Sequence, residues 1–132
     1  MTDWQAVRDH VAVYVMGWHV QHDTDPIHGP FADYYDSSGR HVMDVDDWES
    51  DLSYHEVGMV IEAMRGRFSL TVHSLPLDRV AVNMFEYPLS SAKVKADTYS
   101  RGFVNSDELT LPQAITLAAA LATGYKEDGD EV

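Results

Sequence analysis

The sequence contains no cysteine, few basic residues and no long apolar run, and each absence excludes a class of protein. Without cysteine there is no disulfide framework, thiol nucleophile or cysteine-based zinc site. The 9 lysines and arginines are outnumbered by 22 aspartates and glutamates, which gives a formal net charge of −13. A surface this acidic argues against general binding to nucleic-acid backbone or anionic lipid, since both need a basic face. No apolar run approaches the ~20 residues needed to span a bilayer.

The residues that are present are those of a folded domain. Hydrophobic residues make up 45% of the 132 positions and aromatic residues 11%, which is too many for a wholly disordered chain. We expect one domain over residues 1–125 and a charged, flexible tail over residues 126–132. The start of the chain lacks the basic-then-apolar order of a secretory signal, so we expect a cytoplasmic setting.

Three helices are predicted from apolar periodicity and capping signals. The first covers about residues 3–16, with Thr2 and Gln5 at capping-box spacing. The second begins after Ser53 and ends near residue 64, and the third follows Thr110 and ends at Gly124.

Short extended segments separate these helices. The turn-rich residues 36–39 predict a β-hairpin between residues 31–35 and 40–45. Residues 18–30 predict a polar loop after an initial short strand. Further strands are expected over residues 68–73, 79–85 and 93–99, the last extending to 104 in one reading. The order predicts an α+β fold, with an antiparallel sheet between amphipathic helices in α/β/α layers.

Two segments resemble a known family. Met16-Gly17-Trp18 closes the first predicted helix, and Pro112 opens an Ala- and Leu-rich final helix. With the central helix, these features resemble the phage ABA-sandwich domain family over most of the chain. The resemblance implies a small phage-encoded protein with helices on both sides of a sheet, and it implies no activity.

Metal binding and catalysis find little support in the sequence. His19, His22 and His28, with Asp23 and Asp25, are ligand types that zinc or nickel accepts. We interpret them as solvated residues of an acidic loop and expect no metal site. A histidine–carboxylate pair could serve acid–base hydrolysis, but no phosphate-binding glycine loop or nucleophile elbow is present. We therefore expect no enzyme and no cofactor.

The charge is unevenly distributed along the chain. Residues 23–62 contain eleven acids and one base, Arg40, whereas residues 63–104 carry a net charge of +3. The acidic half suggests carboxylates that imitate phosphates and occupy a host protein's nucleic-acid groove. Its contacts would be Asp33, Asp36, Asp44, Asp46, Asp47, Glu49 and Asp51. The alternative is a surface that only keeps the domain soluble.

The basic half suggests a different site. Lys93 and Lys95 lie two apart on a predicted strand and therefore share a face. With Arg101 they would hold phosphates, while aromatic rings stack on a base. The candidate rings are those of Trp18, Tyr34, Tyr35 and Trp48.

Two functions follow for a non-enzymatic phage accessory protein in the host cytoplasm. The first is an anti-defence protein that sequesters a small nucleotide-like immune signal, in a pocket completed by contacts in a homo-oligomer. The second is an acidic DNA mimic that inhibits a host nucleic-acid enzyme such as a CRISPR effector. An accessory protein without a defence role is the third reading. None of these binds nucleic acid or membrane directly.

Overall fold

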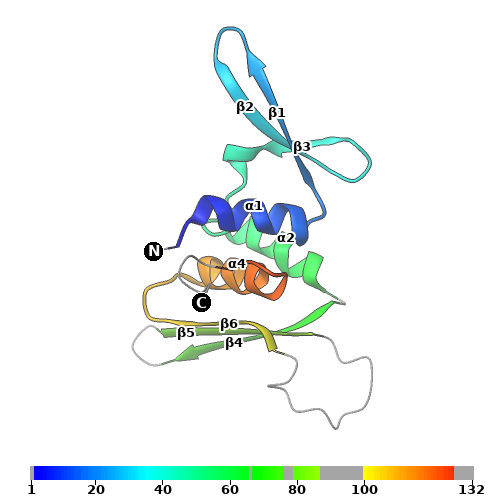
Figure 1. The fold of residues 1–132 in the computed structure, drawn as a ribbon. Helices are drawn as coiled ribbons and strands as arrows, with labels where there is room; N and C mark the ends of the chain where they lie inside the picture. Colours follow the sequence, from blue (N-terminus) through cyan, green and yellow to red (C-terminus); the bar gives the residue numbers. More distant parts are fainter. Residues whose placement is uncertain (1, 66, 76–78, 87–99, 127–132) are drawn as a thin grey trace.

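The computed structural model describes residues 2–65, 67–75, 79–86 and 100–126 of the chain (Figure 1). The elements, in order, are α1 (Trp4–Tyr14), β1 (His19–Asp25), β2 (Gly29–Tyr35), β3 (His41–Asp44), the short 3-10 helix η1 (Val45–Asp47), α2 (Tyr54–Met64), β4 (Phe68–Leu75), β5 (Arg79–Glu86), β6 (Ser100–Ser106) and α4 (Leu111–Ala122). The predicted residues 93–99 and the tail beyond residue 126 lie outside the described residues.

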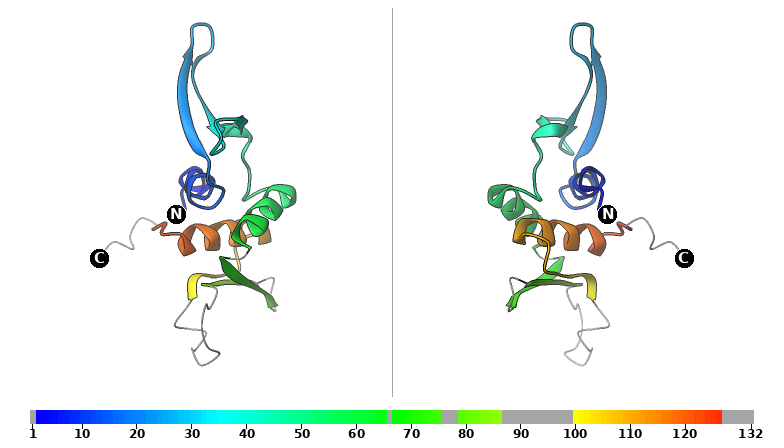
Figure 2. Two further views of the ribbon diagram at one scale, coloured as in Figure 1. Left: turned by 90° about the vertical axis from the view of Figure 1, so that its right-hand side faces the viewer. Right: turned by 90° about the vertical axis from the view of Figure 1, so that its left-hand side faces the viewer.

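The α+β class predicted from the sequence is confirmed, and all described strand pairs are antiparallel. The strands form two sheets, β1-β2-β3 and β4-β5-β6, instead of one sheet covered on both faces. The three helices lie between them (Figure 1). Helix α4 packs on β5 and β6, and α1 and α2 pack against α4 on the other side (Figure 2).

The core is centred on the contact between α4 and the second sheet. Ala114, Ala118 and Ala120 are fully buried on α4, and the strands contribute Val82 and Met84. Small side chains let the helix backbone approach the sheet closely. At Gly102 of β6 the approach is so close that an added Cβ would overlap the carbonyl oxygen of Ala118. The alanine-rich stretch therefore has a packing role.

Two of the predicted helix starts are confirmed, and one is wrong in detail. Thr110 and Gln113 form a complete capping box at α4, and Ser53 accepts a hydrogen bond from the Glu56 amide at α2. At α1 the cap is Asp3, which accepts from the Ala6 amide, whereas the sequence predicted Thr2. Either side chain supplies an oxygen acceptor, so local spacing alone did not decide between the two.

The largest correction concerns residues 18–30, which form most of a β-hairpin arm (residues 19–35) and not a loop. Strand β1 pairs with β2 along its whole length, from His19 opposite Tyr35 to Asp25 opposite Gly29. The arm projects beyond the helices (Figures 1 and 2), so both of its faces meet solvent near its tip. A strand exposed on both faces lacks the apolar alternation by which strands are recognised. The predicted hairpin of residues 31–45 is confirmed as β2 and β3.

Candidate functional site

The root of the arm is anchored by three aromatic side chains. Trp18, Tyr34 and Trp48 are 8%, 0% and 0% exposed. The ring of Trp18 lies 4.9 Å from that of Trp48 and 5.7 Å from that of Tyr34, measured between centroids. From the sequence, these rings are predicted to form a stacking site for a nucleotide base. Buried in this way they offer no free face, so that assignment is corrected: they are core residues.

Polar contacts fix the same root to α1. The Tyr34 hydroxyl donates to Asp9 Oδ1 over 2.6 Å, and Trp48 Nε1 donates to the Arg8 carbonyl over 3.2 Å. Burial, together with the bond to Asp9, raises the pKa of Tyr34. The hydroxyl therefore keeps its hydrogen and remains a donor across the physiological range.

The sequence predicted Asp51 as a contact on an exposed acidic surface. That prediction is wrong, because Asp51 is the buried partner of Arg8. The Arg8 guanidinium donates from Nε to Asp51 Oδ1 over 2.6 Å and from Nη2 to Oδ2 over 3.1 Å. The side chain of Asp51 is 2% exposed. This two-point geometry raises the pKa of Arg8 and makes the pair a structural tie between α1 and the segment before α2.

The remaining candidates for a phosphate pocket are not brought together in the described structure. Lys93 and Lys95 lie outside the described residues. Arg101 belongs to β6, on the opposite side of the helices from the aromatic cluster (Figure 1). Tyr35 is half-buried on the arm, where its ring stacks on His19 at 5.7 Å. Arg101 therefore belongs to the second sheet, whereas the four aromatic residues lie in or next to the first sheet.

The acidic candidates divide into structural and exposed residues. Asp36 accepts hydrogen bonds from the Ser38 hydroxyl and from the Arg40 and Ser38 amides, which shape the β2–β3 turn, and these bonds, the hydroxyl's above all, lower the pKa of Asp36. Asp33 is only 8% exposed. The exposed carboxylates are those of Asp44, Asp46, Asp47 and Glu49.

An open groove of about 700 Å³ runs between the arm and η1, and we call it the arm groove. Its lining residues are His22, Asp23, Thr24, Asp25, His28, Pro30, Phe31, Ala32, Asp44, Val45 and Asp46. These include four carboxylates and two imidazoles but no lysine or arginine. The groove therefore presents negative potential to any ligand, with the exposed ring of Phe31 as an apolar contact.

Part of this acidity also holds the arm together. Asp25 Oδ1 accepts from the amides of Ile27 and His28 over 2.7 and 3.3 Å, and these bonds lower the pKa of Asp25. Gly29, with a φ of +87°, completes the turn. Asp23, by contrast, is exposed on strand β1, where its carboxylate accepts a hydrogen bond from the Thr24 amide.

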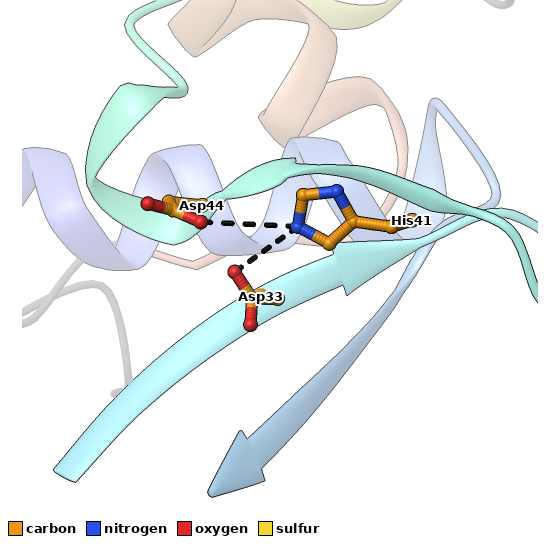
Figure 3. A group of neighbouring side chains, drawn as sticks. All are labelled: Asp33, His41 and Asp44. Atoms are coloured by element: carbon orange, nitrogen blue, oxygen red, sulfur yellow. Dashed lines mark hydrogen bonds and ion pairs between the residues drawn. The ribbon is translucent and has the colours of Figure 1, made fainter. Parts of the chain in front are cut away.

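Asp33, His41 and Asp44 lie together as a triad (Figure 3), and Asp44 also lines the arm groove. His41 Nε2 is 3.2 Å from Asp33 Oδ1 and 3.8 Å from Asp44 Oδ1. Hydrogen bonding with Asp44 and then with His41 lowers the pKa of Asp33, whereas the hydrogen bond and charge of Asp33 raise the pKa of Asp44. Two carboxylates this close repel each other, so Asp33 favours its charged form while Asp44 holds its proton more tightly.

The groove positions of His22, Asp23 and Asp25 were not predicted, because the sequence indicated a polar loop there and not a strand. The usable signal was local: Pro26 and Gly29 mark a turn between two segments of similar length. The triad was also missed, because its members meet only through the register of β2 and β3.

No family model, curated protein or solved structure matches this chain. Among the described residues, no helix is long and apolar enough to cross a membrane.

Proposed function

We propose that this protein is a non-enzymatic, acidic binding protein whose arm occupies a cationic, nucleic-acid-binding surface of another protein. The observation that carries the proposal is the arm groove, which is lined by four carboxylates without a lysine or arginine. The arm that forms one side of this groove projects beyond α1, α2 and α4 (Figure 1). Such a surface suits a partner that normally binds phosphates. A phage-encoded inhibitor acting in the host cytoplasm on a nucleic-acid enzyme, such as a CRISPR effector, is the biological setting that we propose.

The geometry supports this role in two ways. The root of the arm is fixed to α1 through the buried Tyr34, which bonds to Asp9, and through Trp48, which bonds to the Arg8 carbonyl. A root that is already fixed loses little conformational freedom on binding, so more of the electrostatic attraction contributes to affinity. Asp46 and Asp47 extend the negative surface along η1, where both side chains are exposed.

Retention of a host enzyme on the immobilised chain tests the proposal. Bacterial lysate is passed over the chain, and bound protein is eluted with double-stranded DNA or with salt. We expect a nucleic-acid enzyme to elute with both, because counter-charges and DNA compete for the same cationic groove. The absence of any DNA-eluted protein would contradict the proposal.

A matched pair of variants separates the arm from overall charge. Asp46→Asn/Asp47→Asn removes two adjacent exposed charges beside the arm groove. Asp107→Asn/Glu108→Gln removes two adjacent exposed charges from the segment between β6 and α4, which lies apart from the arm (Figure 1). We expect only the first variant to reduce retention, and equal losses in both would indicate nonspecific charge attraction.

Sequestration of a nucleotide-like signal stays a prediction from the sequence, and the described structure adds no support for it. Its phosphate contacts, Lys93 and Lys95, lie outside the described residues, and three of its four rings are in the core. Calorimetric titration with cyclic dinucleotides and ADP-ribose derivatives tests it. Binding that Lys93→Ala or Lys95→Ala weakens would favour sequestration over mimicry.

A further inference from the structure

The triad of Asp33, His41 and Asp44 has a geometry that its hairpin does not explain. In the β2–β3 register Asp33 lies directly opposite Asp44. Like charges at directly opposite positions destabilise an antiparallel pair. The ion pairs recorded for these two carboxylates within the described structure are both with His41. One half-exposed imidazole carries at most a single positive charge against these two carboxylates.

An irregularity in the hairpin brings the imidazole to this position. Asp33 pairs with Asp44 and Tyr34 with Met43, but the register then shifts so that Tyr35 pairs with His41. Without the shift Tyr35 would pair with Val42, and His41 would lie on the opposite face of the strand. Bulges commonly redirect a side chain toward a functional position. Here the bulge places an imidazole on the face that carries both carboxylates.

The distances match those between the ligands of a tetrahedral cation. Metal–ligand bonds of ~2.0–2.1 Å place tetrahedral ligand atoms about 3.3 Å apart. The imidazole nitrogen is 3.2 Å from one carboxylate oxygen and 3.8 Å from the other, and the three donor atoms lie within 4.8 Å of one another. No rearrangement of the strands is needed to bring three ligands to one ion.

We propose that Asp33, His41 and Asp44 form a binding site for a divalent transition-metal ion of the zinc type. The imidazole favours Zn²⁺ over Mg²⁺ or Ca²⁺, which prefer all-oxygen sites. Three protein ligands leave one position for water or for a donor from a bound partner. The side chains of His41 and Asp44 are 51% and 65% exposed, so this position is open to solvent.

The inference goes beyond the proposed binding function and is tested on the isolated chain. Zinc binding is measured by competition with a chromophoric chelator, and Mg²⁺ is added as a competitor. We expect one bound zinc per chain that excess Mg²⁺ does not displace. Displacement by Mg²⁺ at comparable concentration would overturn the proposal, because it would indicate simple attraction to acidic side chains.

A second imidazole–carboxylate pair, at the turn between β1 and β2, provides the matched control. His28 Nδ1 lies 3.4 Å from Asp25 Oδ2, but no third ligand joins this pair in the described structure. Loss of an outer-shell partner alone typically costs ~10- to 100-fold in metal affinity. We therefore expect His41→Gln and Asp44→Asn each to weaken zinc binding at least ~10-fold and His28→Gln to leave it unchanged. Equal affinities in His41→Gln and His28→Gln would overturn the proposal.

Thermal unfolding supplies a readout independent of the chelator. A cation that binds only the folded chain raises its melting temperature. We expect zinc to raise it in the wild-type chain and in His28→Gln but not in His41→Gln; an equal rise in all three would overturn the proposal. The Asp46→Asn/Asp47→Asn variant keeps all three ligands and should bind zinc normally even where it fails to retain a partner.

Discussion

Tyr34 of β2 donates its hydroxyl hydrogen to Asp9 of α1 over 2.6 Å, and this bond joins the root of the projecting arm to the helices. Tyr34 is fully buried and also contacts Trp18, so one side chain belongs both to the core and to the arm. The arm groove is therefore built on a fixed base.

Tyr34→Phe should destabilise the fold by about 1–2 kcal/mol, because it removes a hydrogen bond to a carboxylate while keeping the ring. The effect stays modest because Asp9 also accepts a hydrogen bond from Gln5. Urea denaturation measures the free energy of unfolding. Tyr35→Phe is the control, since Tyr35 faces the other side of β2, and it should change stability by less than ~0.5 kcal/mol. Equal losses of unfolding free energy in the two variants would show that the Tyr34–Asp9 hydrogen bond does not stabilise the fold.

Arg8→Gln should destabilise by about 3 kcal/mol, because it leaves Asp51 buried without a cation. The comparison variant is Arg40→Gln, which removes an exposed arginine from the β2–β3 turn and should cost less than ~0.5 kcal/mol. Urea denaturation again distinguishes them. A small cost for Arg8→Gln would show that water reaches Asp51.

Gly102→Ala should destabilise by at least ~1–3 kcal/mol, since its Cβ would overlap the backbone of Ala118 on α4. Gly58→Ala is the opposite case. Gly58 lies within α2, with no atom within 4 Å of an added Cβ, so alanine should stabilise the helix by ~0.5–1 kcal/mol. Melting temperatures that moved in the same direction for both would contradict the packing described for α4.

Stability should fall as the pH is lowered from 7 to 5, in part because of His10. Its Nε2 lies 3.2 Å from the Thr123 carbonyl oxygen and 3.0 Å from Thr123 Oγ1, and burial lowers the pKa of His10 despite this carbonyl. The unfolded chain then takes up a proton more readily than the folded chain as the pH falls through ~6.5. His10→Gln should flatten the dependence of the unfolding free energy on pH. An unchanged pH dependence in His10→Gln would contradict this role of the buried imidazole.

The parts of the fold predicted from the sequence are those with local signals. The Ser53 and Thr110 caps mark the starts of α2 and α4, and the alternation of Phe68, Leu70 and Val72 marks β4. The rest depends on long-range contacts. Arg8 and Asp51 are 43 positions apart, and no spacing rule joins them.

The sequence predicted that the candidate site is acidic, but it did not predict the hairpin arm and the groove that the acidic residues form. The excess of acids in residues 23–62 indicated an acidic surface, and Asp44, Asp46, Asp47 and Glu49 are exposed as expected. Asp33 is buried because of the strand register, and Asp51 is buried because it pairs with Arg8, which is distant in the sequence. Neither can be inferred from composition.

Competition between this protein and DNA for one purified host enzyme tests the central claim most directly. With the enzyme identified by DNA elution, its affinity for the chain is measured at increasing concentrations of double-stranded DNA. We expect the apparent dissociation constant to rise linearly with the DNA concentration, and we expect Asp46→Asn/Asp47→Asn to weaken binding while Asp107→Asn/Glu108→Gln does not. A complex that holds the chain and DNA together, with unchanged affinity for each, would contradict the proposed function.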